Sequence, residues 1–589
     1  MRAFYLNERR IAGVYIIIMI MAGFVFFKLY TISSSDYSDV MPVLTSQYTR
    51  KLNVAERRGF IFDRNGDRIA GLDDAFNCVV DPSKMSGGIS NTDFIDFEKA
   101  ASIIADACEL DYVDSDYILD RLVQGRPFII RVNQNLNADY MKSYRTFKRN
   151  NGVNFPALHI IGYLDSDGVG VTGIEAAHHD FLVQTGSKID ALYDSDALNK
   201  SLKTSPIRTV DYGYNTKTGI MLTLDLELQN KVEAIADKYF NQNSQNNKNN
   251  KNNKGAIIIA SASTGEILAS VSRPVFSPNH LADYIDSPNG EFINRAFSSF
   301  TPGSIFKTIV AAAALEDNPD YFNYNYDCVG YIHTGSRTFY CRGGWGHRDL
   351  NMCEAYAHSC NTYFMDLALQ IGYDKIRDMA KLFGIGEKNM LDGLFTQSGN
   401  IPDVINPTPA FIANTAIGQG EWLITPLEAV RIFCAIANNG VLPELSLIKS
   451  FVFENQTSNV PNTASQKILS DTTVDYLLQM TQACVSHGTG ELAAPQHGVA
   501  GGKTSSAESG QYADIPGDDG VIRKTQIVHS WFSGYYPADV SDIGDVGEIA
   551  DISHEKYAIS IIAEGGVTEN IKSAAIFKEI CDFLYAFGN

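Results

Sequence analysis

One serine–lysine pair constrains this chain more than any other feature. Ser304-Ile305-Phe306-Lys307 follows Thr301-Pro302-Gly303 and opens the alanine-rich apolar run 308–315. Pro-Gly ends an extended approach, and the run behind it strongly favours a helix. Ser304 is therefore predicted in the first helical turn, where free N–H groups and the positive end of the helix dipole gather. Lys307 falls on the same face, so the pair combines a nucleophile with a base and indicates acyl transfer.

The spacing alone is weak evidence, because Ser-x-x-Lys occurs three times in the chain. Ser446 lies in the alternating run 445–453, which predicts a strand, and residues three apart on a strand point to opposite faces. Ser553 lies in a polar turn before another predicted strand. Only Ser304 has the helical context that the chemistry needs, and its alternative interpretation is an ordinary helix start.

Two further motifs follow Ser304 along the chain. Ser359-Cys360-Asn361 lies between two predicted helical stretches, whereas the other Ser-x-Asn triplets lie in loops or polar runs. Lys503-Thr504-Ser505 comes last and carries Ser505 where a glycine is expected. A literal Lys217-Thr218-Gly219 precedes Ser304 and leads into a predicted structural strand, so Lys503 is favoured. Ser-x-x-Lys, Ser-x-Asn and Lys-Thr-Gly in this order mark penicillin-binding proteins and serine β-lactamases.

Within that group the chain resembles the class B penicillin-binding proteins, the peptidoglycan D,D-transpeptidase type. The resemblance runs from Arg58 to the C-terminus, over roughly 530 residues. The further motifs that carry it are 58–66, 173–175, 255–259, 264–269, 294–296, 416–420 with 425–427, 488–490 and 529–534. A β-lactamase or a β-lactam sensor is an alternative to this family, but neither has the long N-terminal module.

The resemblance implies roles for the first two motifs. Ser304 would be the nucleophile and Lys307 its base, which requires a lowered lysine pKa. Burial and a nearby cation lower such a pKa, and Lys503 could be that cation. Ser359 would relay a proton, and Asn361 would orient Lys307 and a substrate amide.

The resemblance also implies roles for the third motif. Lys503 and Thr504 would bind the terminal carboxylate of the stem peptide, and the backbone N–H groups of Ser304 and Ser506 would form the oxyanion hole. Ser505 belongs to the same substrate-binding strand. Because a glycine there lets substrate backbone approach closely, we expect Ser505 to slow acylation by β-lactams.

The activity that the resemblance implies is serine D,D-transpeptidation, which cross-links peptidoglycan stem peptides ending in D-Ala-D-Ala and is blocked by β-lactams. The alternatives are a D,D-carboxypeptidase and a catalytically weak or silent scaffold in a wall-synthesis complex, although the complete motif set argues against the scaffold. A membrane-embedded glycan polymerase of the SEDS type is the expected partner, and no metal or organic cofactor is expected. The motifs do not separate elongation, division and sporulation roles.

An apolar segment near the N-terminus predicts a membrane anchor. The seventeen residues Ile11–Phe27 are uncharged, and Lys28 can extend its amine to the interface. Arg2, Arg9 and Arg10 precede the segment, so the N-terminus is expected in the cytoplasm and everything after residue 30 outside it. A cleaved signal peptide is the alternative, but the run is long and no Ala-x-Ala site follows.

Composition excludes some partners and some cofactors. The formal net charge is −20 and no basic stretch is flanked by aromatic residues, which argues against nucleic acid. Nine cysteines show no Cys-x-x-Cys or Cys/His zinc spacing, so a metal site is not expected. Cys328 and Cys341 could form a disulfide, although small buried thiols are the favoured interpretation.

The predicted domains end in an α+β unit. They are a cytoplasmic tail (1–10), the transmembrane anchor (11–30), a polar tether (31–56), a mixed α/β dimerisation or pedestal module (57–215), a connecting helix with an Asn-rich loop (216–254) and the transpeptidase domain (255–589). In the last, the predicted elements are strands 256–260 and 266–271, a largely helical region to about 439, strands 525–536 and 556–563, and a helix 571–587. This order predicts an antiparallel sheet sandwiched by helices.

Overall fold

The computed structural model describes two compact units. Its described residues are 2–34, 48–70, 73–85, 97–108, 114–149, 155–202, 204–214, 216–240, 254–335, 337–341, 344–387, 390–453, 456–460, 465–516, 522–538, 555–566 and 572–587. The first unit comprises Met1–Arg57, Asp74–Phe147 and Ser187–Tyr214, and the second Arg58–Asp73, Lys148–Gly186 and Asn215–Asn589. The segment predicted as a pedestal module, 57–215, is thus shared between both units.

The first unit begins with a long helix. Helix α1 (Arg2–Ser34) contains the stretch Ile11–Thr31, which is long and apolar enough to cross a membrane and has none of its residues buried. It includes the predicted anchor. The predicted tether is helical as far as Ser34 and is strand β1 from Thr49, while residues 35–47 lie outside the described residues.

Two sheets and two helices follow in the first unit. Strands β1 (Thr49–Arg57), β8 (Ser187–Asp194) and β9 (Arg208–Asp211) form one sheet in the order β1-β8-β9. Strands β4 (Asp73–Val80), β5 (Phe128–Val132), β6 (Asn137–Ala138) and β7 (Met141–Lys148) form the other. Helices α3 (Phe97–Asp106) and α4 (Ser115–Gln124) bury apolar residues against this second sheet.

The centre of the second unit is a five-stranded antiparallel sheet. Its order is β12-β11-β25-β24-β23, formed by Ile267–Arg273, Lys254–Ser261, Tyr557–Gly566, Ile522–Tyr536 and Gly501–Pro516. Every neighbouring pair in it is antiparallel. The continuous apolar run Ala256–Ala260 in β11 is buried on both faces, as the predicted strand requires. The predicted strands 256–260, 266–271, 525–536 and 556–563 are confirmed as β11, β12, β24 and β25.

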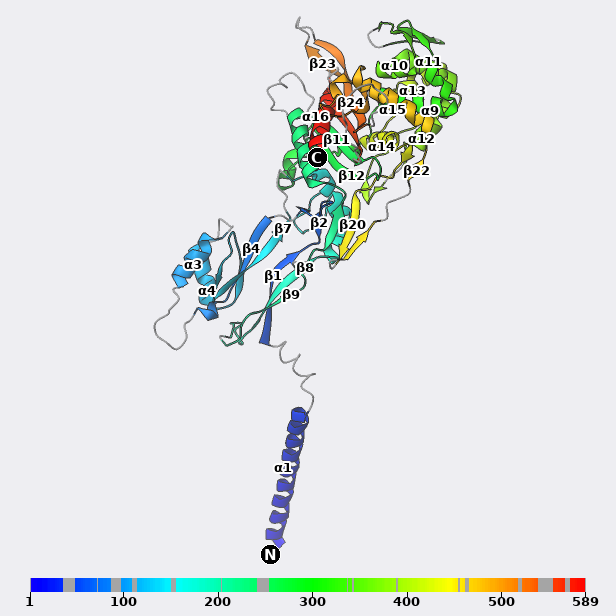
Figure 1. Ribbon diagram of the computed structural model, residues 1–589. Helices are drawn as coiled ribbons and strands as arrows, with labels where there is room; N and C mark the ends of the chain where they lie inside the picture. The colour runs from blue at the N-terminus through cyan, green and yellow to red at the C-terminus, as the bar shows by residue number, and fades with distance from the viewer. Residues whose placement is uncertain are drawn as a thin grey trace. The chain divides into compact units, whose positions relative to one another are not determined.

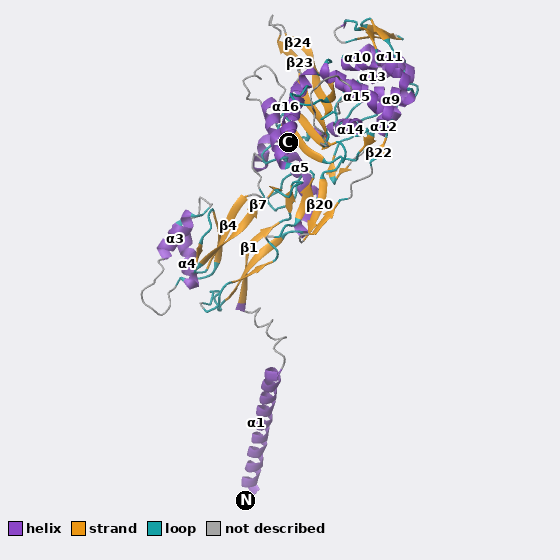
Figure 2. Ribbon diagram, in the orientation of Figure 1, coloured by secondary structure: helices purple, strands orange, loops and turns teal. Residues whose placement is uncertain are grey.

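Helices cover both faces of this sheet (Figures 1 and 2). Helices α8 (Leu226–Phe240) and α16 (Lys572–Phe587) pack with one set of side chains, including Ile257 and Ile259. Helices α9 (Lys307–Asp317) and α14 (Pro426–Ala437) pack with the alternate set, including Ala256 and Ile258. Because side chains alternate across a strand, each helical layer meets its own set. The predicted α+β sandwich is confirmed.

The remaining elements flank this core. The other helices of the second unit are α5 (Leu158–Ile161), α6 (Gly173–Ala177), α7 (His179–Gln184), α10 (Met352–Ala357), α11 (Asn361–Ile371), α12 (Tyr373–Leu382), α13 (Pro409–Ala416) and α15 (Asp471–Ser486). A second sheet, β21-β20-β10-β2-β3, uses Gln456–Asn459, Ile448–Phe453, Gly219–Leu222, Phe60–Phe62 and Arg68–Ala70. The short strands are β13 (Tyr326–Cys328), β14 (Tyr331–Thr334), β15 (Arg337–Tyr340), β16 (Arg348–Leu350), β17 (Met390–Leu391), β18 (Leu394–Phe395), β19 (Val441–Leu442) and β22 (Gln466–Lys467).

The structure locates two of the other copies of the motifs, those at Lys217 and Ser446. Lys217-Thr218-Gly219 leads into β10, as predicted. Ser446 forms an isolated bridge with Glu266 ahead of β20, so the strand starts later than the alternating sequence suggested. Ser553 and residues 241–253 of the Asn-rich loop lie outside the described residues.

Candidate active site

The nucleophile candidate Ser304 lies where a helix begins. It belongs to a single 3₁₀ turn, Gly303–Phe306, that runs directly into α9. Gly303 has φ +55°, and a Cβ there would collide with the Ser505 hydroxyl. The Gly303 N–H donates to the Gly418 carbonyl at 3.0 Å. The predicted helix start is confirmed, with the detail that its first turn is 3₁₀ rather than α.

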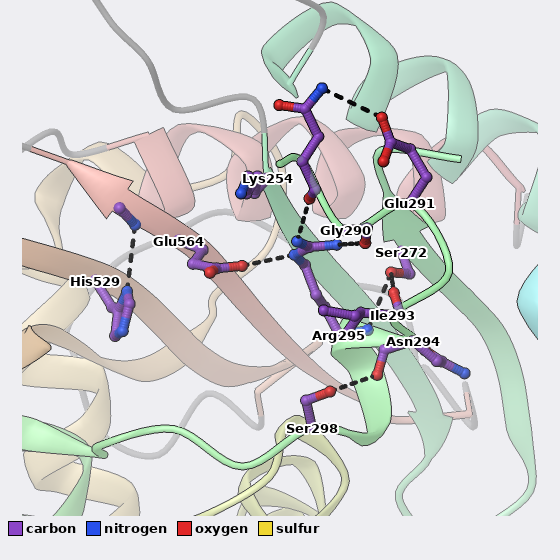
Figure 3. A network of polar contacts seen from close by, with 12 residues as sticks. Lys254, Ser272, Gly290, Glu291, Ile293, Asn294, Arg295, Ser298, His529 and Glu564 are labelled. Atoms are coloured by element: carbon purple, nitrogen blue, oxygen red, sulfur yellow. Dashed lines mark hydrogen bonds and ion pairs between the residues drawn. The ribbon is translucent and has the colours of Figure 1, made fainter. Parts of the chain in front are cut away.

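The segment that leads to Ser304 is anchored by a buried arginine (Figure 3). The Arg295 guanidinium pairs with Glu564 on β25 at 2.6 Å and donates to the Gly290 carbonyl at 2.9 Å. The Arg295 backbone N–H donates to the Ser272 hydroxyl on β12 at 3.0 Å. Because a buried charge is stable only when paired, these bonds fix the approach to the nucleophile on the sheet.

Lys307 is fully buried, and the second motif supplies its acceptors. Its Nζ donates to the Ser359 carbonyl at 2.7 Å, to Asn361 Oδ1 at 2.7 Å and to Ser359 Oγ at 3.2 Å. The amine also lies 5.7 Å from the centroid of the Phe364 ring. The first two predicted motifs are thus brought together around one amine.

Ser359 connects that amine to Ser304. It lies between α10 and α11 with φ +57°, a left-handed conformation that costs a residue with a side chain about 1–2 kcal/mol. Its hydroxyl donates to Ser304 Oγ at 3.1 Å. Lys307, Ser359 and Ser304 are thus joined by a continuous chain of hydrogen bonds.

The third motif lies on β23. Lys503 is fully buried, with Nζ 5.4 Å from the centroid of the Tyr356 ring, and it donates to the Thr504 carbonyl at 3.2 Å. The Thr504 hydroxyl lies 2.6 Å from that of Thr489. Thr489 was not among the predicted site residues, although the Gly-Thr-Gly motif around it could have identified it.

Ser505 contacts the backbone of Ser304. It is buried, its Oγ accepts from the Ser304 N–H at 2.8 Å, and it donates to the Pro302 carbonyl at 2.8 Å. The strand that carries the third motif is thereby bonded to the turn that carries the first.

The three motifs share one cavity of about 300 Å³. Of the predicted site residues, Ser304, Ser359, Asn361, Thr504, Ser505 and Ser506 line it. The other lining residues are Ile417, Gln419, Thr489, Glu508, Ser530, Trp531, Ser573 and Ala574. A serine nucleophile, a buried lysine and hydroxyl-bearing walls can perform acyl transfer on a peptide that enters this cavity.

A cluster of three cysteines and one histidine adjoins the second motif. Ligand atoms of Cys328, Cys341, His347 and Cys360 all lie within 4.8 Å of one another. His347 Nδ1 is 3.6 Å from Cys328 Sγ and 3.4 Å from Cys341 Sγ, and the Cys341 and Cys360 sulfurs are 3.8 Å apart. The hydrogen bond between these last two thiols lowers the pKa of Cys360 and raises that of Cys341 to about 12.

This donor set fits zinc, which structural sites bind tetrahedrally through Cys₃His. The cluster differs from the expectation that the cysteines form no metal site, because its members are spread over residues 328–360 without a short cysteine motif. The paired strands β13 with β16 and β14 with β15 bring them together. Cys328 and Cys341 are buried, as the thiol interpretation expected, but they lie in this cluster and not as isolated thiols.

The order of these motifs agrees with comparisons to known proteins. The sequence profile of the penicillin binding protein transpeptidase domain matches residues 255–575, more than half of the chain. The chain belongs to the penicillin-binding protein transpeptidase family. That range includes all eight predicted site residues, from Ser304 to Ser506.

Two curated members of the family illustrate the similarity. Stage V sporulation protein D of Bacillus subtilis is 26% identical over 510 residues, covering 84% of this chain and 74% of that protein. Peptidoglycan D,D-transpeptidase MrdA of Escherichia coli K12 is 24% identical over 504 residues, covering 75% and 74%.

Solved penicillin-binding proteins have the same fold. Penicillin binding protein 3 of Mycobacterium tuberculosis, in complex with aztreonam, has a TM-score of 0.60 at 20% identity and covers 91% of this chain and 97% of its own. A chain from a structure on coordinated polymerization and crosslinking by a peptidoglycan synthase complex has a TM-score of 0.63 at 22% identity, covering 97% and 98%.

Proposed function

We propose that this penicillin-binding protein is a membrane-anchored serine D,D-transpeptidase that cross-links peptidoglycan stem peptides and is acylated by β-lactams on Ser304. The observation that carries the proposal is the bonded path from Lys307 through Ser359 to Ser304 at the wall of a cavity. The name of the Escherichia coli relative, a peptidoglycan D,D-transpeptidase, supports the same substrate class.

In the acylation step, Ser304 Oγ attacks the carbonyl carbon between the two terminal D-alanines. Its proton passes through the Ser359 hydroxyl to Lys307, which must first be in the neutral amine form. The C–N bond then breaks, and the proton returns to the nitrogen of the departing D-alanine. The products are an ester on Ser304 and free D-alanine, and no oxidant, metal or organic cofactor takes part.

The groups around the cavity support substrate binding. The hydroxyls of Thr504, Thr489 and Ser506 lie at its wall and can donate to the terminal carboxylate. The buried Lys503 ammonium, from the same strand β23 as Thr504 and Ser506, adds a positive field. Asn361 lines the cavity while its Oδ1 accepts from Lys307, which leaves its NH₂ group to donate to a substrate amide.

In the second step, an acceptor amine attacks the ester and forms the cross-link. Attack by water instead would give D,D-carboxypeptidation through the same acyl-enzyme. We favour transpeptidation because the relatives named for that reaction cover most of this chain, including the part before residue 255. The bonded Ser/Lys/Ser/Asn set also argues against a silent scaffold.

We place the catalytic unit outside the cytoplasm, with α1 in the membrane and the N-terminal arginines inside. A membrane-embedded glycan polymerase of the SEDS type is the partner that fits such an anchor. The structural neighbour from a peptidoglycan synthase complex supports this pairing.

The decisive experiment is to map the adduct of a labelled penicillin by mass spectrometry. We expect one covalent adduct on Ser304, none in a folded Ser304→Ala variant, and wild-type labelling of Ser446→Ala and Ser553→Ala. An adduct on another serine, or no adduct on folded protein, would overturn the assignment.

We further propose that Cys328, Cys341, His347 and Cys360 hold a structural zinc ion. Three of these four side chains are buried, and their number and type match the preference of the metal. Because Cys360 stands between Ser359 and Asn361, an ion there would fix the segment that carries both residues.

A further inference from the structure

We propose that the Ser505 hydroxyl accepts the oxyanion-binding N–H of Ser304 in the resting enzyme, and that the substrate carbonyl oxygen must displace it as Ser304 attacks. Ser505 then lowers the rate of acyl transfer through the Ser304 N–H without itself touching the reacting atoms. The inference rests on the proposed function, since it concerns how the Ser304 acyl-enzyme forms.

The first step is where the negative charge develops. When Ser304 Oγ attacks a carbonyl, the oxyanion forms on the carbon bonded to Oγ, close to the serine's own main chain. The backbone N–H of a serine nucleophile is one of the donors that stabilise such an oxyanion. The Ser304 N–H can stabilise the oxyanion only if it is able to donate its hydrogen bond to the substrate.

The second step is that this N–H already has an acceptor. Ser505 Oγ lies 2.8 Å from the Ser304 nitrogen and accepts its hydrogen. The one proton of the Ser505 hydroxyl is donated to the Pro302 carbonyl at 2.8 Å. Lone pairs of Ser505 Oγ therefore face the Ser304 N–H. They would repel an oxyanion that formed beside this N–H.

The third step is that Ser505 is tightly packed beside Gly303 and Ser304. Ser505 is 4% exposed. A Cβ on Gly303 would collide with Ser505 Oγ and would lie only 3.0 Å from the Ala507 Cβ. Ser505 also stands where the family pattern has glycine, so the hydroxyl is an addition of this chain to a site that otherwise matches the pattern.

The Ser505 hydrogen bond therefore slows the chemical steps but does not weaken the initial noncovalent binding. The substrate must exchange one neutral hydrogen bond for its own, which slows acylation about fivefold for a bond of ordinary strength. Hydrolysis of the acyl-enzyme passes through a second oxyanion at the same place, so it is slowed by a similar factor. Noncovalent binding before the attack is unaffected.

The test compares Ser505→Ala and Ser505→Gly with wild type in stopped-flow acylation by a chromogenic cephalosporin. Alanine keeps Cβ and removes the hydroxyl, so it separates the hydrogen bond from steric hindrance. The matched control is Ser509→Ala on the same strand, whose hydroxyl also donates to a carbonyl, that of Ile527 at 2.8 Å. Thermal unfolding confirms that each variant is folded.

We expect the acylation rate constant of Ser505→Ala to rise about fivefold, that of Ser505→Gly to rise at least as much, and that of Ser509→Ala to stay at the wild-type value. The infrared C=O stretch of a ¹³C-labelled acyl-enzyme should shift to lower frequency in Ser505→Ala, because the freed Ser304 N–H then donates to the ester. A purely structural role for Ser505 would not move this band.

Three outcomes would overturn the proposal. Ser505→Ala could react at the wild-type rate or more slowly; only Ser505→Gly could react faster, which would assign the effect to Cβ; or the ester band could stay unchanged. If neither wild type nor any variant formed an adduct on Ser304, the proposed function would fail and this inference with it.

Discussion

The Ser359 hydroxyl donates a 3.1 Å hydrogen bond to the Ser304 hydroxyl, which places the serine of the second motif between Ser304 and Lys307. If Ser359 relays the proton, Ser359→Ala should slow acylation by a labelled penicillin about a hundredfold or more, the scale of losing one proton-transfer group. The control is Ser298→Ala, whose hydroxyl donates to the Asn294 carbonyl at 2.9 Å. Labelling of Ser359→Ala within a few-fold of wild type would show that Lys307 acts on Ser304 without a relay.

The cysteine–histidine cluster predicts bound zinc. Purified full-length protein should carry about one zinc ion per chain by elemental analysis, and a strong chelator should lower the unfolding temperature. Cys328→Ser and Cys341→Ser should lose the metal, whereas Cys434→Ala, a buried cysteine in α14, should keep it. Protein produced with added zinc that contains none would refute the prediction.

Stability at acidic pH should depend on His159. Burial lowers its pKa from 6.5 to about 4, while its Nε2 donates to the Glu291 carbonyl at 2.8 Å. As pH falls below 6.5, His159 binds a proton in the unfolded chain, whereas in the folded chain it stays neutral until about pH 4. The free energy of unfolding should therefore fall across this window, by up to about 3 kcal/mol.

The measurement is urea denaturation of wild type and His159→Gln between these pH values. The glutamine amide can still donate to Glu291 but does not titrate, so the variant should lose less stability on acidification. A residual slope is expected, because burial also lowers the pKa of His529. Identical pH profiles for the two proteins would contradict the assignment to His159.

Membrane topology follows from helix α1. External protease added to wall-stripped cells should digest the chain beyond residue 30, because the arginines before Ile11 favour retention of the N-terminus inside. A cytoplasmic marker protein should stay intact in the same sample. Full protection of peptides containing Ser304 would reverse the orientation, and mature protein in the medium would indicate a cleaved signal.

Much of the second unit could be predicted because its signals are local. The alanine-rich run behind Ser304 and the apolar run of β11 determine a helix and a buried strand by propensity and periodicity alone. Motif order then indicated which serines and lysines belong together. The first unit was harder, since the polar alternating residues of β1 resemble a tether until they pair with β8.

The contacts that sequence reasoning missed depend on long-range folding. The cysteine cluster forms around two strand pairs, β13 with β16 and β14 with β15, which lie one inside the other along the chain. The spacing of its cysteines in the sequence therefore does not show that they meet. Ser505 was recognised as a departure from a glycine. The acceptor role of its hydroxyl could not be predicted, because it depends on the backbone of Ser304, which lies 201 residues earlier in the chain.

Among the described strands of the central sheet, β23 is at the edge, with β24 as its neighbour, and three consecutive residues of it line the cavity. An extended peptide that lies along an edge strand is held through main-chain groups, which are the same for every amino acid. If the proposed stem peptide pairs with this edge, the enzyme would recognise the direction of the peptide and its free end more than its side chains. A bacterium could then change the residues of its stem peptide that project away from the strand and still have its wall cross-linked by the same protein.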